Sequence, residues 1–101
     1  MRPGTTKTAT LTTGYQRLAT LYGADTGDAI KTADGKEVAN QCLLSIITQA
    51  GEIAFGETMP LSSGHPIAAG SSFEMGNQAY IQLAWVRGTS GAIAIITPLF
   101  E

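Results

Sequence analysis

The sequence predicts an all-β protein, built as a single β-sandwich of Greek-key or jelly-roll type with an extended N-terminal arm. Short β-prone runs, about six to eight of them, are separated by turn residues at roughly the 8 to 12 residue spacing of sandwiches and barrels. Almost no helical period interrupts them, and a chain of 101 residues has room for one domain. We therefore expect a flexible arm at residues 1–13 and the sandwich at residues 14–101.

The arm, "MRPGTTKTATLTT", is rich in threonine, and Leu11 is its one large aliphatic residue after Met1. Such a segment buries too little apolar area to offset the entropy lost on ordering, so we expect it to be loose unless a partner or neighbouring subunit holds it. Threonine suits an extended backbone, so an ordered arm should be an added strand. The candidate partner-binding residues are Thr5, Thr6, Lys7, Thr8, Thr10, Leu11 and Thr12.

The next two segments carry weaker patterns. "YQRLATLYG", residues 15–23, is compatible with a strand or with a helical turn, because its apolar residues recur at spacings of three and four. In "DTGDAIKTADGKEV", residues 25–38, the pair Asp34-Gly35 predicts a hairpin turn. Asp25, Asp28 and Asp34 lack the spacing of an EF-type calcium loop, so turn chemistry explains them better.

The segment "NQCLLSIITQAGEIAFGE", residues 40–57, predicts two strands joined around Gln49-Ala50-Gly51 at the centre of the fold. Its apolar run is too short for a typical helix and ends at a turn signal. Cys42 is the single cysteine and lies in this run, so we expect a buried small hydrophobe and no internal disulfide.

Three further strands are expected after this centre. "SFEM" places Phe73 and Met75 on one face, and Pro60, Gly64, Pro66 and Gly70 break regular structure before it. "AYIQLAWV" alternates so that Trp85 shares a face with Ile81 and Leu83, which predicts Trp85 in the core and leaves Tyr80 on the opposite face as the better surface aromatic. "RGTSG" turns the chain, and "AIAIITPL" completes a terminal hairpin that we expect Pro98 to end. This hairpin shares its pattern with "SIITQAGEIAF".

Composition excludes several classes of function. The net charge is −2 and no basic run appears, so direct nucleic-acid binding is not expected. The N-terminus lacks the apolar core of a signal peptide and no window approaches the roughly 20 apolar residues of a membrane span, so we expect no contact with a membrane. Charged residues make up 14% of the chain against about 25% in typical soluble domains. The surface should therefore be neutral and suited to protein contact, including a homo-oligomer.

No constellation for catalysis is visible. The single histidine, His65, cannot build a cupin-type metal site, which uses several histidines, and "SSGHPIAAGSS" does not resemble a nucleophile elbow. We therefore expect no enzyme activity, no metal and no cofactor. A carbohydrate-binding module is an open alternative, because β-sandwiches bind glycans through exposed aromatic rings flanked by polar residues, as Tyr80 is by Gln82.

Residues 51–96, "GEIAFGETMPLSSGHPIAAGSSFEMGNQAYIQLAWVRGTSGAIAII", resemble a class of small phage structural proteins. In that class a strand ending in "vG" is followed by a "G-x-P-L-x-A-G-E-S" element, a "vYv-x-a" strand and a final "G-t-x-v-x-v" hairpin. This chain supplies "AFGET", "SGHPIAAGSSFEM", "AYIQLAW" and "GTSGAIAII" in that order, with Ser71 where an acid is common.

The resemblance implies a virion structural protein made in the host cytoplasm. Its place would be the capsid surface, as a decoration or cement protein bound to the major capsid protein or other virion proteins; neck or tail placement is the alternative. It also implies that Gly64-His65-Pro66 is a turn, with the glycine supplying an unusual dihedral angle, and that His65 lies near the surface. Gly70 would let the chain reverse into "SSFEM".

Overall fold

The computed structural model describes residues 2–23 and 29–101, and it confirms the all-β prediction at the level of two antiparallel sheets with 45% of residues in strands. Two short helices, α1 (Leu18–Tyr22) and α2 (Gln78–Leu83), complete the structure. Sheet A contains β1 (Arg2–Pro3), β2 (Lys7–Thr10), β4 (Gln41–Ile47), β7 (Ser71–Met75) and β9 (Ile93–Phe100). Sheet B contains β3 (Gln16–Arg17), β5 (Gly51–Phe55), β6 (His65–Ile67) and β8 (Ala84–Gly88).

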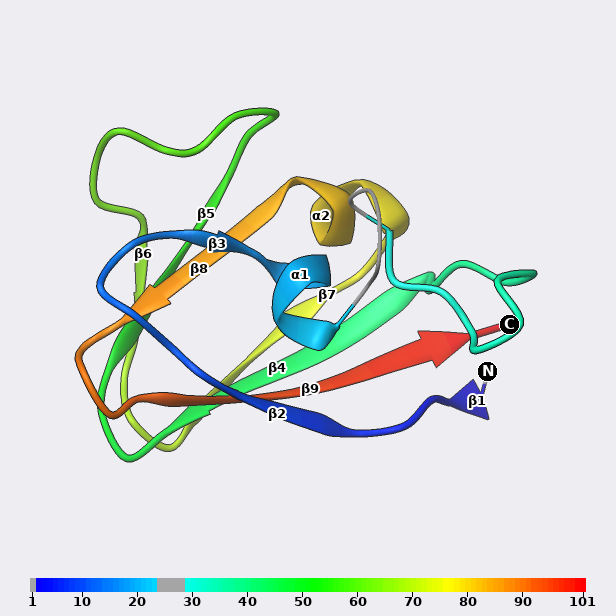
Figure 1. Cartoon of the computed structure of the whole chain (residues 1–101), viewed down its shortest axis with the longest axis horizontal. Helices are drawn as coiled ribbons and strands as arrows, with labels where there is room; N and C mark the ends of the chain where they lie inside the picture. Colours follow the sequence, from blue (N-terminus) through cyan, green and yellow to red (C-terminus); the bar gives the residue numbers. More distant parts are fainter. Residues whose placement is uncertain (1, 24–28) are drawn as a thin grey trace.

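The strands pair from the outside of the chain inward. β2 pairs with β9, β3 with β8, β4 with β7 and β5 with β6, all antiparallel, and successive pairs alternate between sheet A and sheet B. Additional pairings of β4 with β9 and of β5 with β8 join these pairs into the two sheets. The pairs are thus nested along the chain, and the loop between β5 and β6, at the upper left of Figure 1, is the innermost connection. We call residues 56–64 the apex loop.

One hydrophobic core cluster takes side chains from both sheets. In β4 the side chains of Cys42, Leu44 and Ile46 are buried and alternate with outward residues, which is the period of two that a strand with one dry face requires. β9 buries Ala94, Ile96, Pro98 and Phe100 in the same way. The predictions of two strands in residues 40–57 and of a buried Cys42 are confirmed.

The two predicted hairpins are wrong. β4 and β5 lie in different sheets, as do β8 and β9, so the turns at Gln49-Ala50-Gly51 and at "RGTSG" carry the chain from one sheet to the other. β9 also continues through Pro98, which pairs with Cys42. Pro98 is tolerated there because its carbonyl still accepts from the Gly4 amide at 2.7 Å, and proline lacks only the donor.

The prediction of a single strand over "AYIQLAWV" is also wrong. Residues 78–83 form α2, whose N-terminus is capped by the Asn77 side chain accepting from the Tyr80 amide at 3.1 Å, and β8 begins at Ala84. The change from helix to strand shifts the phase, so that Ala84 and Val86 are buried and Trp85 lies on the outer face of sheet B. Tyr80 is exposed, as predicted.

Residues 15–23 use both of the open alternatives, since β3 is followed directly by α1. Gly23 ends that helix in the left-handed region, with φ of 96°. The Asp34-Gly35 turn is confirmed: Lys31 and Val38 form a bridge, and the Asp34 carboxylate accepts from the Thr32 hydroxyl and the Lys36 amide. Asp25 and Asp28 lie outside the described residues.

The stretch around His65 is a strand and not the predicted turn. β6 pairs with β5 so that His65 lies opposite Ile53, and the His65 side chain is exposed as expected. Gly64 has no positive φ; instead, a Cβ at this position would lie 2.4 Å from the Ile53 carbonyl oxygen. Glycine is therefore required there for close approach of the chain to β5. Gly70 does have a positive φ, 87°, and reverses the chain into β7 as predicted.

The N-terminal segment is paired with its own sheet, which differs from the expectation of a loose arm. β1 and β2 both pair with β9, and Leu11 is buried with 2% of its surface exposed. Leu11 fills the space above Gly88, where an added Cβ would meet its side chain at 2.9 Å. Hydrogen bonds of Thr6 with Thr97 and of the Tyr22 hydroxyl with the Thr5 carbonyl also hold this segment, which is an added strand as the threonine content predicts.

Candidate functional site

β2 forms one edge of sheet A. It pairs with β9 on one side, and its other side pairs with no strand in the described part of the chain. The Leu11 amide donates to the Ala92 carbonyl at 2.8 Å, so by the alternation of antiparallel pairs the amides of Thr8 and Thr10 point away from β9. This open row of backbone donors and acceptors is a template for an added strand.

The structure brings most of the predicted partner-binding residues to this edge. Thr5, Thr6, Lys7, Thr8, Thr10 and Thr12 are exposed. Tyr22 donates its hydroxyl to the Thr5 carbonyl, and the Lys7 ammonium lies 4.4 Å from the centre of the Tyr22 ring. Leu11, in contrast, belongs to the core, so its side chain is closed to a partner in this conformation.

The outer face of sheet A is nearly uncharged. It presents Thr8 and Thr10 from β2, Leu43, Ser45 and Ile47 from β4, Ser72 and Glu74 from β7, and Ile93, Ile95 and Thr97 from β9. Glu74 is the single charged member of this set, and Leu43 is 37% exposed. A solvated sheet face ordinarily carries charged residues, so a face of four aliphatic side chains, five hydroxyl side chains and one carboxylate is suited to contact.

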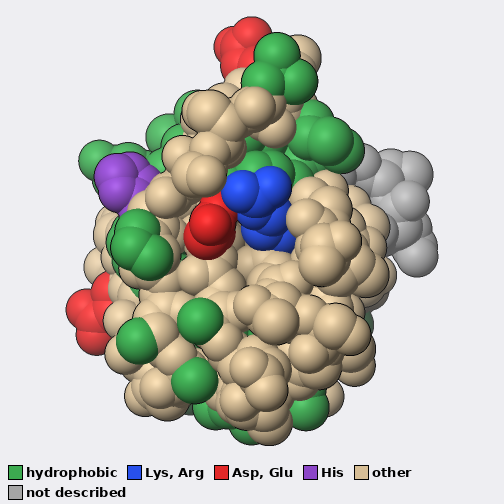
Figure 2. All heavy atoms as spheres, turned by 90° about the vertical axis from the view of Figure 1, so that its left-hand side faces the viewer, with side chains coloured by type: hydrophobic (Ala, Val, Ile, Leu, Met, Phe, Trp, Pro, Cys, Tyr) green, Lys and Arg blue, Asp and Glu red, His purple; other side chains and the backbone are tan. Residues whose placement is uncertain are grey.

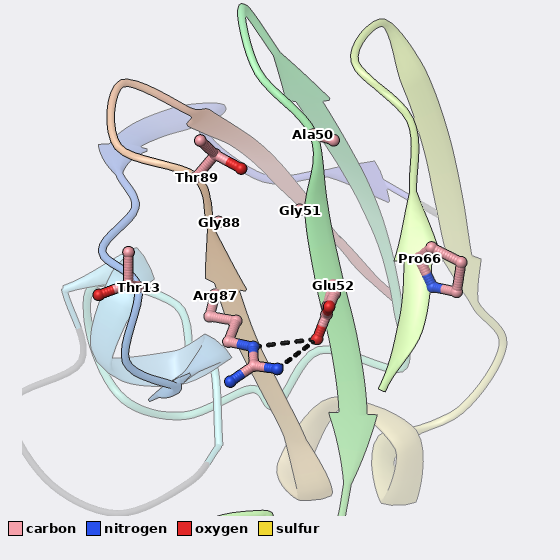
Figure 3. Close-up of a pocket in the computed structure, with 8 residues that line it drawn as sticks. All are labelled: Thr13, Ala50, Gly51, Glu52, Pro66, Arg87, Gly88 and Thr89. Carbon is pink, nitrogen blue, oxygen red and sulfur yellow. Dashed lines mark hydrogen bonds and ion pairs between the residues drawn. The ribbon is translucent and has the colours of Figure 1, made fainter. Parts of the chain in front are cut away.

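A second feature lies on the outer face of sheet B, where Glu52 organises a polar cluster. Its Oε2 accepts from the Tyr15 hydroxyl at 3.1 Å, from Arg87 Nε at 2.9 Å and from the Gly64 amide at 3.3 Å. Arg87 Nη2 lies 2.8 Å from the same oxygen, and the Arg87 guanidinium stacks 4.4 Å from the centre of the Tyr15 ring. Figure 3 shows Arg87 and Glu52 turned toward one another from the adjacent strands β8 and β5.

This cluster shifts two titrating groups in opposite directions. The hydrogen bond from Arg87, with smaller contributions from the Gly64 amide and the Tyr15 hydroxyl, lowers the pKa of the Glu52 carboxyl. Burial, followed by the hydrogen bond to Glu52, raises the pKa of the Tyr15 phenol. The Glu52 carboxyl therefore stays ionised at neutral pH.

The apex loop is held at both ends by side chains of sheet B and by Tyr15, which directly precedes β3. The Gly56 carbonyl accepts from the Trp85 indole at 2.9 Å, and the Glu57 carbonyl accepts from Arg17 at 2.8 Å. On the returning side, the Ser62 carbonyl accepts from the Tyr15 hydroxyl at 3.3 Å. Between these anchors Met59 is half exposed and Leu61 is fully exposed.

The surface around the Glu52–Arg87 pair is hollowed. The hollow has a volume of about 460 Å³, and its side chains come from Thr13, Ala50, Glu52, Pro66, Arg87 and Thr89. Figure 2 shows it in the centre of the face turned to the viewer, with an acidic and a basic side chain next to one another inside it and the apex loop projecting above.

The aromatic residues considered for sugar binding differ in how open their rings are. The Arg17 guanidinium covers Trp85 at 4.5 Å from the ring centre, and the Trp85 indole N–H already donates to Gly56. Tyr80 is 52% exposed and packs edge-on against Phe55, 5.5 Å between ring centres. Tyr80 is therefore the more open ring for stacking on a ligand.

Within residues 2–23 and 29–101, no group of three or more His, Cys, Asp or Glu side chains is placed to hold a metal ion. The helices of the same residues include none that is long and apolar enough to cross a membrane. Comparison of the chain with protein-family models, with curated proteins and with solved structures finds no match.

Sequence reasoning missed the polar cluster and the anchored apex loop. Tyr15, Glu52 and Arg87 are distant in the chain, and nothing in their local sequence indicates that β3, β5 and β8 are neighbours. A weak signal was present in "ETMPL", where Met59 and Leu61 flank a proline between two polar stretches, because apolar residues in a predicted loop are unusual.

Proposed function

We propose that this chain is a non-enzymatic virion structural protein, a capsid decoration or cement protein that binds the outside of a phage head and stabilises it. The observation that carries the proposal is the nearly uncharged outer face of sheet A together with the open edge of β2 in the same sheet. These are the features of a protein whose work is contact, and the resemblance of residues 51–96 supplies the kind of assembly.

The proposal includes a β-sandwich of jelly-roll type. Its support is the nested pairing of β2 with β9, β3 with β8, β4 with β7 and β5 with β6, with successive pairs in alternate sheets. A jelly roll is a long antiparallel hairpin wrapped in this way into two packed sheets.

The partner in this proposal is the major capsid protein or another virion protein. A strand of the partner adds to β2, while the outer face of sheet A packs on the partner's surface. Because many copies bind a repeating lattice, a modest free energy at each site adds up to resistance of the whole shell against internal pressure.

Co-sedimentation with undecorated shells tests the proposal. Wild-type protein should pellet with shells and raise the temperature at which they disassemble. Leu43→Asp places a charge on the outer face of sheet A and should weaken binding at least about tenfold, which is roughly 1.4 kcal/mol. Ala79→Lys, a change at an exposed position of α2, is the matched control and should bind as wild type.

The edge itself is tested by Thr8→Pro. This substitution removes an amide that points away from β9, so the pairing of β2 with β9 is retained while an added strand loses a donor. Thr8→Val keeps that amide and should bind normally. Binding to neck or tail particles but not to shells would move the protein to the alternative placement, and binding to none of these particles would overturn the proposal.

A carbohydrate-binding function is favoured by one observation, the exposed Tyr80. Two results together would establish that function in place of the virion role. The wild type should bind a glycan array but not shells, and Tyr80→Ala should lose the glycan binding.

A further inference from the structure

The face that carries the apex loop and the hollow has a projecting part and a receiving part side by side (Figure 2). We propose that this face binds a second copy of the chain, with the tip of each apex loop, Met59 to Leu61, seated in the hollow of the other copy. The result is a two-fold dimer. The inference does not depend on the virion role, because it concerns the free protein.

The projecting part is exposed, and its loop is held in place by contacts within the single chain. Leu61 is fully exposed and Met59 is 52% exposed, which leaves a Met-Pro-Leu tip in water. The loop that carries them is held by hydrogen bonds from Trp85, Arg17 and Tyr15 to its backbone carbonyls. An anchored loop loses little conformational entropy when it docks, so the burial of its apolar tip contributes directly to affinity.

The receiving part has the chemistry that a peptide segment requires. Ala50 and Pro66 supply apolar wall, and Thr13 and Thr89 supply hydroxyls. Arg87 binds Glu52 through Nε and Nη2, and both contacts reach the same oxygen, Oε2. Arg87 Nη1, which carries two N–H donors, and the acceptor Glu52 Oε1 thus make no hydrogen bond to any described residue, and both residues line the hollow.

A peptide unit complements this pair, because its carbonyl accepts and its amide donates. The tip of the apex loop combines such peptide units with apolar side chains, and at about 460 Å³ the hollow is large enough for one Leu or Met side chain with its backbone.

The two parts lie on the same face, so a two-fold arrangement makes the contact twice. When the loop of one copy enters the hollow of another, a two-fold axis brings the partner's loop to the first hollow, which is the reciprocal arrangement of an isologous dimer. The doubled contact closes the assembly and leaves the β2 edge and the outer face of sheet A free.

Sedimentation equilibrium of the full chain over a concentration series tests the dimer. The wild type should approach the mass of two chains of 10.5 kDa each. Leu61→Asp should weaken association at least about tenfold without change of fold, because Leu61 has no packing to lose. Ala50→Trp places a large side chain in the hollow itself and should also weaken association at least about tenfold. Leu43→Asp, an equivalent change on sheet A, should dimerise as wild type.

Directed cross-linking tests the contact itself. Leu61→Cys and Ala50→Cys are prepared as separate proteins, each with Cys42→Ser, so that a disulfide between the two cysteines can only join two chains. Mixing them under oxidation should give the mixed dimer faster than mixing Leu43→Cys with Ala50→Cys. A wild type that is monomeric at every concentration, or a dimer unaffected by both Leu61→Asp and Ala50→Trp, would overturn the inference; neither result would bear on shell binding.

Discussion

Gly64 provides a sharp test of why the chain needs glycine beside its single histidine. In Gly64→Ala the new Cβ would lie 2.4 Å from the Ile53 carbonyl oxygen, 2.8 Å from the Ile53 carbonyl carbon and 2.9 Å from the Ala54 Cβ. Ordinary contact begins at 3.4 Å, so β6 must retreat from β5 by about 1 Å. Two of these three neighbours are backbone atoms, which cannot turn aside as the end of a flexible side chain does.

The cost follows from what the retreat breaks. The pairing of β6 with β5 near His65 and the hydrogen bond from the Gly64 amide to Glu52 are lost or weakened. At about 1 kcal/mol for a neutral hydrogen bond and about 1.5 to 3 for one to a charged group, we expect Gly64→Ala to lower the free energy of unfolding by roughly 2 to 4 kcal/mol. The measurement is urea denaturation, with the slope against urea unchanged.

Two further variants make the result decisive. Gly76→Ala has nothing within 4 Å of the added Cβ and no positive φ, so its unfolding free energy should stay within about 0.5 kcal/mol of wild type. Gly64→Asn should cost as much as Gly64→Ala, because any Cβ meets the same backbone. A turn glycine of positive φ would instead tolerate Asn better than Ala. That order, or a Gly64→Ala as stable as wild type, would refute the close-approach argument.

Three other predictions concern Cys42, Glu52 and Trp85. Burial raises the pKa of the Cys42 thiol to about 12, so a thiol reagent at about pH 8 should label it only after unfolding; rapid labelling of native protein would contradict its core position. The folded-state pKa of Glu52 is lowered, chiefly by the Arg87 hydrogen bond, so the stability it contributes is present above its ordinary value of 4.5 and is lost as the pH falls through the lowered pKa. Unfolding free energies measured from about pH 6 to about pH 3 should fall less in Glu52→Gln than in wild type, with the remaining fall including Asp34, whose pKa the Thr32 hydroxyl lowers; equal slopes would remove Glu52 from the account. Trp85, the single tryptophan, lies on the outer face of sheet B and should be quenched by acrylamide in the native protein, whereas native emission that resists quenching until unfolding would place it in the core.

The sequence predicts strands best where apolar runs are bounded by turn residues. Residues 40–57 show this, since the alternation in "QCLLSII" is enough to indicate that Leu44 and Ile46 share the buried face of one strand. The pattern says nothing of which sheet receives the next strand. A turn such as Gln49-Ala50-Gly51 has the same local chemistry whether it closes a hairpin or crosses between sheets, so the hairpin prediction there had no local signal to correct it.

The strand prediction for "AYIQLAWV" is wrong for a different reason. Over eight residues a period of two and a helical turn followed by a strand are hard to distinguish, because Ile81 and Ala84 are also three apart, as on one helical face. Asn77 was the available signal: an Asn whose side chain caps the amide three residues later favours a helix start. Reading that cap would have moved Trp85 to the outer face.

The candidate site likewise has one part that the sequence predicts and one part that it does not. The neutral outer face of sheet A can be predicted from alternation, since Leu43, Ser45 and Ile47 alternate with the buried residues of β4. The anchored apex loop and the hollow depend on Tyr15, Glu52 and Arg87 meeting across three strands, and only the folded chain brings those residues together.

Hydrogen exchange of the β2 amides tests the central claim, that this protein functions by contact through the edge and outer face of sheet A. The Thr8 and Thr10 amides point away from β9, so in the free protein they should exchange much faster than the Ala9 amide, which faces β9. On shells, an added strand should protect Thr8 and Thr10 while Ala9 changes little. Protein that co-sediments with shells yet leaves the Thr8 and Thr10 amides as open as before would contradict the account, because the bound surface would then lie elsewhere.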